Sequence, residues 1–540
     1  MSRGFFQLFS RMMRRLSLLS LAGLALIFCC LTPSASTQNP LSPQESRGKE
    51  IYLLGASKSG KEILAYIGDA SLEVPGSAMA CANCHGLNGQ GKSEGGIDPS
   101  NITWEALTKP YGVTHASGRK HPAYTGRALE LAITRGLDPG GNTLLYAMPR
   151  YQMSRADLDD LVVYLKRLGT DLDPGISEDK IVIGTVLPES GPLAEMGQLV
   201  KGLLAGYFSE INQQGGIYNR RLELQSIETT AGATATRSAV ERLVKDERVF
   251  AMTSVFLAGS ESEVVPLLAD LQVPVIGPMT LDPRPGRPVN RQVFYLLTGN
   301  ADQGRALVSF VAKKPEVKNG GLALVYYQTE LNQRVLAAVK GEVEKQSLKS
   351  TQVFEYANGG FNAADSVRQL HEHEPGAVFF LGSGSDLLSF MKEAEKISWY
   401  PQILLTAGAA SREIFEAPRG FEGKIFFTAP TSPADQTETG LKEFQALAEK
   451  YKLSQKHLAA QLTAYSAAKM LVEAMRRVGK DLTREKLIET LEGFYEYSTG
   501  LTPALSYGPN RRIGAFGAYV VLVDLKEKKF VPVGGWIPLN

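Results

Sequence analysis

Hydrophobic and polar residues follow a helical period in the N-terminal part of the chain. Between residues 158 and 168, leucine and valine recur at intervals of three and four positions, which predicts one apolar helix face. Ser154 precedes this segment and Asp157 follows three positions later, a pattern typical of a helix N-cap. A similar pattern over residues 48–54 predicts a first helix. We therefore expect a small all-α domain over residues 42–170.

From residue 180 onward, short continuous apolar runs alternate with longer helical patterns. Such runs are typical of buried strands, and their alternation with helices predicts parallel sheets covered on both faces. About 360 residues remain in this part of the chain, so two sheets are expected rather than one. The polar, proline-containing segment 171–179 is interpreted as a linker. The predicted strands are 181–186, 249–253, 273–277, 322–327, 377–381, 402–406 and 424–428.

The first residues have the layout of a secretory signal. Four arginines between positions 3 and 15 precede an apolar run over residues 16–31, and small residues follow at 34–36. This layout predicts a signal peptide over residues 1–36 and a periplasmic location for the rest of the chain. An uncleaved signal that anchors the protein to the membrane is the alternative, because the run is only slightly short for a span.

Charge and cysteine content limit which classes of partner and which kinds of chemistry are expected. The chain carries 58 basic and 56 acidic residues, for a net charge of +2, and removing the four signal arginines reverses that sign. No basic excess remains for a nucleic-acid surface, so no nucleic-acid partner is expected. Of four cysteines, Cys29 and Cys30 lie in the signal. The mature chain would hold only Cys81 and Cys84.

Those two cysteines stand in the sequence Cys81-Ala82-Asn83-Cys84-His85, the attachment motif of a covalent haem c. Two thiols about one helical turn apart can each bind a haem vinyl group, and the adjacent imidazole can reach the iron. A thioredoxin-like site does not require His85, and a zinc site would need two further ligands. We predict one covalent haem c, anchored by Cys81 and Cys84, with His85 as an iron ligand.

The second axial ligand of the iron has four candidates: Met148, Met153, His115 and His121. Met148 is favoured because Pro149 follows it and fixes the backbone direction of the loop that precedes the last helix. Met153 fits an apolar contact beside the helix N-cap, and both histidines are expected in a polar surface loop. Arg135, Trp104 and Tyr151 are either haem propionate partners or ordinary surface or packing residues.

The motif Cys81-x-x-Cys84-His85-Gly86, with a Met-Pro loop before a terminal helix, resembles a class I cytochrome c over residues 48–169. This resemblance implies one-electron transfer with His85 and Met148 as the iron ligands. No arrangement of nucleophile, base and oxyanion donors is found, so the chain is not expected to be an enzyme.

Residues 180–540 resemble the type I periplasmic solute-binding proteins of branched-chain amino acid ABC transporters. The motifs that carry this resemblance lie at 183–193, 210–217, 275–278, 302–305 and 508–514. The resemblance implies two lobes with a ligand cleft at the carboxyl ends of the strands. Crossovers expected near 297–299, 429–431 and 507–509 give a first lobe of 180–297 and 431–507 and a second lobe of 298–430 and 508–540.

The amino-acid-binding residues of that family do not carry over to this chain. The family holds the ligand carboxylate with a serine and a threonine and the ammonium with an acidic residue, but Ala258, Leu281 and Ala407 stand at those positions. Covering aromatic residues become Met196 and Leu331. Because a buried, unpaired ammonium would cost about 3–5 kcal/mol, an amino acid is not the expected ligand.

The expected cleft would suit a neutral or weakly polar small molecule, and the alternative is an empty cleft that serves as a docking scaffold. The sequence thus predicts an electron carrier whose second domain senses a non-amino-acid ligand or docks a periplasmic dehydrogenase. The competing interpretation is a substrate-binding receptor for an ABC permease, with an accessory cytochrome domain. The predicted cleft residues are Ser190, Ser254, Ser260, Thr280, Leu281, Leu331, Ser383 and Ala407.

Overall fold

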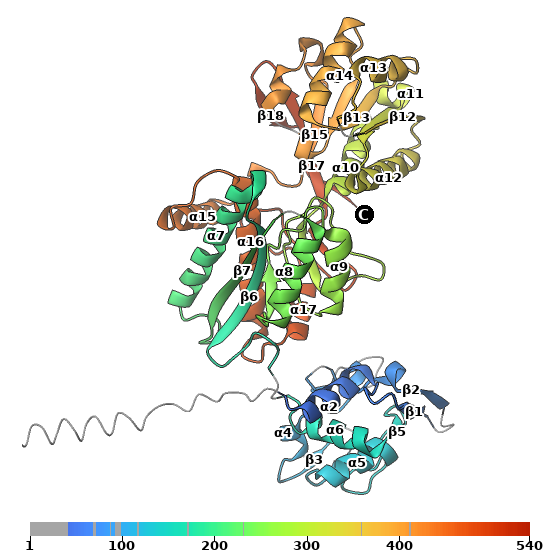
Figure 1. The fold of residues 1–540 in the computed structure, drawn as a ribbon, viewed down its shortest axis with the longest axis vertical. Helices are drawn as coiled ribbons and strands as arrows, with labels where there is room; N and C mark the ends of the chain where they lie inside the picture. Colours follow the sequence, from blue (N-terminus) through green and yellow to red (C-terminus); the bar gives the residue numbers. More distant parts are fainter. Residues whose placement is uncertain are drawn as a thin grey trace, which may run out of the picture. The chain divides into compact units, whose positions relative to one another are not determined.

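The computed structural model (Figure 1) separates into two compact units, with the boundary between residues 171 and 172. The structure describes residues 41–539 except 69–71, 87, 92–98, 116–117, 170–171, 231, 358 and 410–411. The predicted signal peptide lies outside the described residues. Within the described part, no helix is long and apolar enough to span a membrane.

The first unit is built around the crossing of its first and last long helices. Ser42 and Glu45 form a capping box at the start of α2, and Ser154 accepts a hydrogen bond from the Asp157 backbone at the start of α6. Tyr52 and Tyr164 are buried at the crossing, with ring centroids 5.7 Å apart. The helices of this unit are α2 (Pro43–Leu54), η1 (Gly76–Met79), α3 (Cys81–His85), α4 (Trp104–Leu107), α5 (Gly126–Arg135) and α6 (Arg155–Leu165).

This helical unit also carries two small antiparallel sheets, which the helical period did not predict. One has three strands in the order β2-β1-β5, and the other is the ribbon β3-β4. The first sheet joins the segment that precedes α3 to the strand that follows the Met148 loop. The strands are β1 (Leu64–Ile67), β2 (Leu72–Pro75), β3 (Val113–Thr114), β4 (Lys120–His121) and β5 (Arg150–Gln152).

The first lobe of the second unit has a six-stranded parallel sheet in the order β16-β10-β9-β8-β6-β7. Alternate residues of β6 enter two separate cores: Ile181 and Ile183 pack on one face, and Val182 and Val186 on the other. Helices therefore cover both faces of the sheet, as predicted. The strands are β6 (Lys180–Pro188), β7 (Arg221–Thr229), β8 (Ala251–Thr253), β9 (Val275–Ile276), β10 (Val293–Leu297) and β16 (Ile513–Ala515).

The helices of the first lobe come from two separate stretches of sequence. Those that precede β10 follow the strands one by one, and the later ones return to the same lobe after the chain has passed through the second lobe. The elements are η2 (Gly191–Leu193), α7 (Ala194–Gln213), α8 (Ala233–Lys245), α9 (Glu261–Asp270), η6 (Pro433–Asp435), α15 (Glu438–Lys450), α16 (Leu458–Val478) and α17 (Arg484–Glu492).

The second lobe has an eight-stranded mixed sheet in the order β12-β11-β13-β14-β15-β17-β18, with β19 beside β17. Val325 and Phe380 pack in one core, and their neighbours Leu324 and Phe379 pack in another, so this sheet is also covered on both faces. The strands are β11 (Leu322–Tyr327), β12 (Ser350–Tyr356), β13 (Ala377–Leu381), β14 (Gln402–Leu405), β15 (Ile425–Ala429), β17 (Gly517–Asp524), β18 (Lys529–Pro532) and β19 (Ile537–Pro538).

Helices alternate with the parallel strands of this second sheet along the chain, which is the order expected for parallel neighbours. All seven apolar runs predicted from the sequence fall on strands of the two lobes. The helices are α10 (Asn300–Val311), α11 (Pro315–Gly320), α12 (Glu330–Lys345), α13 (Ala363–His371), α14 (Gly384–Lys396), η3 (Ala407–Ala409), η4 (Arg412–Glu416) and η5 (Arg419–Phe421).

The third crossover between the lobes lies later than predicted. Strand β16 pairs in parallel with β10 of the first sheet, and the chain enters the second sheet only at Gly517. Residues 508–515 therefore belong to the first lobe, not to the second. The sequence Ile513-Gly514-Ala515 has only one large apolar side chain and so forms no apolar run, which is why the sequence did not predict this strand. Thr298 donates a hydrogen bond to the carbonyl of Gly517 at 2.7 Å, which joins the first crossover to the third.

The segment predicted as a linker packs against the second unit from residue 172 onward. Ile176 is buried and pairs with Ile181. The Arg484 backbone amide donates a hydrogen bond to the Asp173 carboxylate at 2.5 Å. Residues 172–179 are thus an ordered edge of the second unit. Their polar composition hid this role because only one of the eight side chains, that of Ile176, is fully buried there.

Candidate functional site

The cysteine motif forms its own short helix in the first unit. Residues 81–85 are α3, and both cysteines are free of a disulfide. Burial raises the pKa of the Cys81 thiol to about 11. A thiol of this kind is protonated at neutral pH, in contrast to the low-pKa thiolate that thiol–disulfide exchange requires. The local environment thus disfavours a thioredoxin-like role for the motif.

His85 is buried and held in one orientation. Its Nδ1 lies 3.0 Å from the carbonyl oxygen of Ser100, and its side chain is 8 % exposed. Because a carbonyl only accepts hydrogen bonds, Nδ1 carries the proton and Nε2 keeps its lone pair. Burial also lowers the pKa of His85, which favours the neutral imidazole. This is the protonation state in which histidine binds a metal.

Two buried tyrosines hold the backbone on either side of α3. The Tyr151 hydroxyl of β5 donates to the carbonyl of Met79 at 2.5 Å, and the Tyr52 hydroxyl of α2 donates to the carbonyl of Gly86 at 2.5 Å. Tyr151 was predicted as a propionate partner or a packing residue, and the structure gives its hydroxyl this backbone contact. The sequence patterns do not predict the Tyr52 contact, because they do not show which backbone carbonyl a tyrosine hydroxyl reaches.

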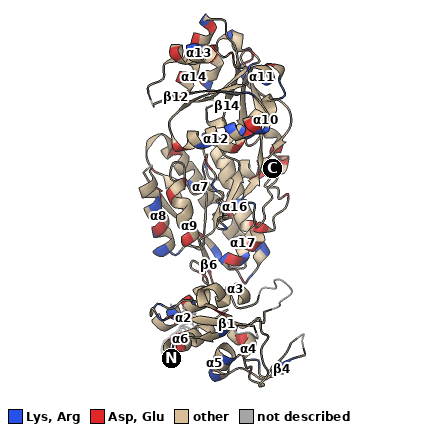
Figure 2. Ribbon diagram, turned by 90° about the vertical axis from the view of Figure 1, so that its right-hand side faces the viewer, with Lys and Arg blue, Asp and Glu red and all other residues tan. Residues whose placement is uncertain are grey.

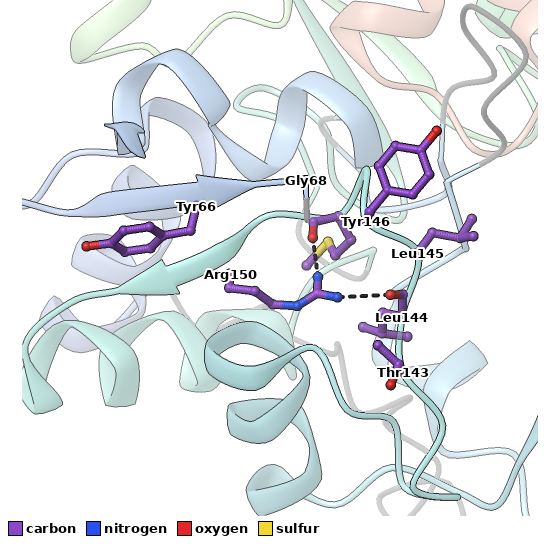
Figure 3. Close-up of a pocket in the computed structure, with 8 residues that line it drawn as sticks. Tyr66, Gly68, Thr143, Leu144, Leu145, Tyr146 and Arg150 are labelled. Carbon is purple, nitrogen blue, oxygen red and sulfur yellow. Dashed lines mark hydrogen bonds between the residues drawn. The ribbon is translucent and has the colours of Figure 1, made fainter. Parts of the chain in front are cut away.

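Met148 lies on the loop between α5 and β5, beside a pocket of about 310 Å³ (Figure 3). Its side chain is partly buried against the core of the first unit. Tyr66 of β1, Arg150 of β5 and residues 143–146 of the loop share the lining of this pocket. The Arg150 guanidinium donates hydrogen bonds to the backbone carbonyls of Met148 and Leu144.

The two histidines that competed with Met148 contact each other instead. His115 and His121 approach with their Nε2 atoms 3.0 Å apart, and an Arg119 nitrogen lies 2.9 Å from the same His115 atom. His121 is buried, so the expectation of a surface loop is wrong for this residue. Met153 packs against the hydrophobic core, as expected of an apolar contact. The two histidines are thus engaged with each other, and Met148 stays the predicted second iron ligand.

The donor set of the first unit fits a covalently attached haem. It combines two free thiols on one short helix with a buried, neutral imidazole whose second nitrogen is fixed by a carbonyl. A thioether on a braced loop completes the set. A polar second-shell partner that fixes the tautomer is typical of metal-binding histidines.

The predicted polar cleft residues of the first lobe already have partners within that lobe. The Ser260 hydroxyl donates to the carbonyl of Leu257 at 2.7 Å, and the Thr280 hydroxyl donates to the Glu261 carboxylate at 2.5 Å. Ser254 is buried at the end of β8 with a positive φ of 54°. Ser190 is exposed after β6. The hydroxyls of Ser260 and Thr280 thus contribute to local structure.

Some of the predicted cleft residues of the second lobe also have roles in local structure. Ser383 caps helix α14, accepting a hydrogen bond from the Asp386 backbone at 3.1 Å. Leu331 packs against the core of the second lobe. Leu281 of the first lobe is 45 % exposed, and a β-carbon at Gly408, next to Ala407, would lie 3.9 Å from its side chain. The structure therefore brings together two positions where carboxylate and ammonium partners were expected.

A set of charged side chains between the lobes was missed by the sequence analysis. Arg334 of α12 donates to the Asp282 carboxylate of the first lobe at 2.8 Å, and Arg284 of the first lobe contacts Glu330 of α12 at 2.8 Å. Asp282 also accepts from Arg284, and its side chain is only 5 % exposed. The partners lie about fifty positions apart, so no local pattern could pair them. Basic and acidic residues are otherwise interspersed along the helices (Figure 2).

Comparison with known families accounts for both units. The family described as "Periplasmic binding protein" matches residues 180–528, which is more than half of the chain. The chain belongs to the periplasmic binding protein family. Residues 76–169 match the cytochrome c family, so this periplasmic binding protein carries an N-terminal cytochrome c domain, which implies haem c. Both families are non-enzymatic in kind and suggest a periplasmic protein.

Individual relatives resemble the binding-protein part. The chain is 21 % identical over 331 residues to a leucine-, isoleucine-, valine-, threonine- and alanine-binding protein of Pseudomonas aeruginosa, covering 60 % of this chain and 86 % of that protein. A branched-chain amino acid ABC transporter protein from Thermus thermophilus, solved with bound valine, matches 67 % of this chain and 97 % of its own at 17 % identity and a TM-score of 0.55.

A further solved structure with this fold is named for a different class of ligand. The fatty acid ABC transporter substrate-binding protein from Thermomonospora curvata matches 68 % of this chain and 95 % of its own, at 18 % identity and a TM-score of 0.53. These similarities support the predicted two-lobed α/β fold following an N-terminal cytochrome c domain.

Proposed function

We propose that the chain is an exported one-electron carrier whose cytochrome domain holds one covalent haem c. Cys81 and Cys84 form the thioether links, and His85 and Met148 are the axial ligands of the iron. The observation that carries this proposal is the His85 imidazole on the helix that bears both thiols: Nδ1 is bound to a carbonyl, and Nε2 has no hydrogen-bond partner among the residues that the structure describes. When bound, the haem supplies a centre that gains and loses one electron.

The chain's own residues set the environment of that centre. The Ser100 carbonyl holds the proton of His85 on Nδ1, and the hydroxyls of Tyr52 and Tyr151 fix the backbone around α3. Met148 contributes a soft thioether, which raises the reduction potential relative to two imidazole ligands.

Haem attachment is tested by substituting each cysteine with alanine and producing the protein with a cytochrome c maturation system. We expect Cys81→Ala and Cys84→Ala each to lose one thioether link, and the double variant to lose all haem that survives denaturing electrophoresis. Asn83→Ala is the matched control, since Asn83 is exposed between the two cysteines. Covalent haem in the double variant would refute the proposal.

For the second domain, we propose a ligand that lacks the charged groups of an amino acid. Leu281 and Ala407 stand where the carboxylate and ammonium partners are expected, and Leu281 faces the backbone beside Ala407. An ammonium buried there without a partner would cost about 3–5 kcal/mol, or more than a hundredfold in affinity. The alternative role of this domain is to dock a periplasmic dehydrogenase as redox partner.

The second candidate function is a substrate-binding receptor for an ABC permease. The similarity to a leucine-, isoleucine-, valine-, threonine- and alanine-binding protein supports it, although the fatty acid receptor shares the fold equally well. Calorimetry with leucine and with isoamyl alcohol, which keeps leucine's side chain without its charges, separates the two. We expect leucine to bind weakly or not at all. Submicromolar leucine binding would favour the amino-acid receptor, and binding of neither compound would favour the docking scaffold.

A further inference from the structure

Arg150 is the residue that ties the Met148 loop together. One nitrogen of its guanidinium donates to the carbonyl of Met148, and another donates to the carbonyl of Leu144 at 2.9 Å. Figure 3 shows the guanidinium reaching from β5 toward the loop that carries Leu144. Pro149 lies between Met148 and Arg150 and has no backbone N–H to offer. A side chain, not regular secondary structure, therefore holds the Met148 carbonyl.

The same guanidinium also lies at the start of the loop, beside the end of helix α5. The Leu144 amide donates to the carbonyl of Gly136 at 2.8 Å. Gly136 ends helix α5 with a positive φ of 66°, and a β-carbon there would lie 1.8 Å from Arg150 Nε. Arg150 thus packs against Gly136, where the loop begins, and donates a hydrogen bond to Met148, where the loop ends.

The Arg150 guanidinium donates its hydrogen bonds to these carbonyls and not to a carboxylate. Among the described residues, no carboxylate forms an ion pair with Arg150. The side chain is partly buried. Hydrogen bonds from a charged donor are roughly twice as strong as neutral ones, and the planar fork of arginine can serve two acceptors at fixed angles.

We propose that Arg150 is a positioning residue that aims the Met148 thioether at the haem iron. Arg150 acts through the backbone of Met148 and Leu144 and touches no reacting atom. This inference rests on the proposed role of Met148 as axial ligand. Loss of the fork would free the loop, weaken the sulfur–iron bond and open the sixth coordination position to added ligands.

The test compares Arg150→Gln with Lys61→Gln, a control that removes an exposed positive charge between α2 and β1 of the same domain. The measurements are the charge-transfer band of sulfur-ligated ferric haem and the affinity for added imidazole, both on the full haem-loaded chain. We expect Arg150→Gln to weaken the band and to raise the apparent imidazole affinity roughly 10- to 100-fold. Lys61→Gln should leave both unchanged.

Arg150→Lys tests the positioning role of Arg150 if Arg150→Gln does not fold. Lysine keeps the charge but cannot donate to both carbonyls in a fixed fork, so we expect a folded protein with an intermediate band and intermediate imidazole affinity. A wild-type band with unchanged imidazole affinity in both Arg150 variants would overturn the inference. Absence of the band in the wild type would instead refute Met148 as ligand, so the two failures are distinct.

Discussion

Gly48 of α2 lies against the backbone of Asp160 in α6. A β-carbon at Gly48 would lie 2.0 Å from the Asp160 carbonyl oxygen and 2.7 Å from the β-carbon of Tyr164. Only a hydrogen atom fits at this point, so the two helices can approach closely enough for Tyr52 and Tyr164 to meet. The packing of the cytochrome domain therefore depends on a glycine far from the cysteines.

Gly48→Ala should destabilise the cytochrome domain, because the extra methyl group forces the helices apart. We expect the free energy of unfolding to fall by about 1–3 kcal/mol, measured by urea unfolding followed through haem absorbance. Ser46→Ala is the matched control on the exposed side of α2 and should change stability by less than about 0.5 kcal/mol. Equal stabilities of the two variants would contradict the close-packed crossing.

Sequence periodicity predicted the parts of the fold that local patterns determine. The helix after Ser154 and the seven buried strands are long or apolar enough to be recognised singly. The strands β1, β2 and β5 have only three or four residues and are largely not buried, so no period marks them. Strand β16 is buried, but only one of its three residues, Ile513, has a large apolar side chain, so it was missed together with the third crossover.

The candidate site likewise has one part that the sequence predicted and another that it did not. The motif of Cys81, Cys84 and His85 is contiguous, so its chemistry was predictable from the sequence. The Ser100 carbonyl and the Arg150 fork depend on tertiary contacts, and no pattern of residue types marks a backbone acceptor. Met148 as ligand stays a prediction, and so does the composition of the ligand cleft.

The charged contact between the lobes should be worth more than a surface ion pair. In a double-mutant cycle of Asp282→Asn with Arg334→Gln, we expect a coupling free energy of about 1–3 kcal/mol, because the Asp282 side chain is only 5 % exposed. The pair Asp365 and Arg368 on α13, with 37 % and 66 % exposed side chains, is the control and should couple by about 0.2–1 kcal/mol. A coupling no larger than the control's would argue against a lobe-to-lobe contact in solution.

Acid should destabilise the cytochrome domain through Glu130. Hydrogen bonds from Arg155 and then Arg127 lower the pKa of Glu130 from 4.5 to about 2. A lowered pKa stabilises the fold above pH 4.5, and this contribution is lost as the pH falls from 4.5 toward 2. Glu130→Gln should therefore reduce the melting temperature at pH 7, and its difference from the wild type should shrink over that window.

The control for this pH profile is Glu62→Gln, which neutralises an exposed carboxylate of the same domain. Its melting temperature should follow that of the wild type at every pH. If the Glu130→Gln difference were constant from pH 7 to pH 2, the ion pairs with Arg155 and Arg127 would not be the source of the stabilisation.

The start of the binding-protein domain can be located by truncation. A fragment of residues 172–540 should unfold at a higher urea concentration than a fragment of residues 177–540. The shorter one loses the buried Ile176 and the Asp173 carboxylate that accepts from Arg484. We expect the loss of Ile176 alone to lower the free energy of unfolding by about 2 kcal/mol or more. Identical unfolding curves would mean that residues 172–176 are a free linker.

The central claim is that this periplasmic binding protein carries a haem c with His85 and Met148 as iron ligands. The most direct measurement is the absorption spectrum of the oxidised, haem-loaded chain compared with its Met148→Ala variant. We predict the weak near-infrared charge-transfer band of sulfur-ligated ferric haem in the wild type, its loss in Met148→Ala, and a lower reduction potential in the variant. The same band in both proteins would contradict the assignment of Met148.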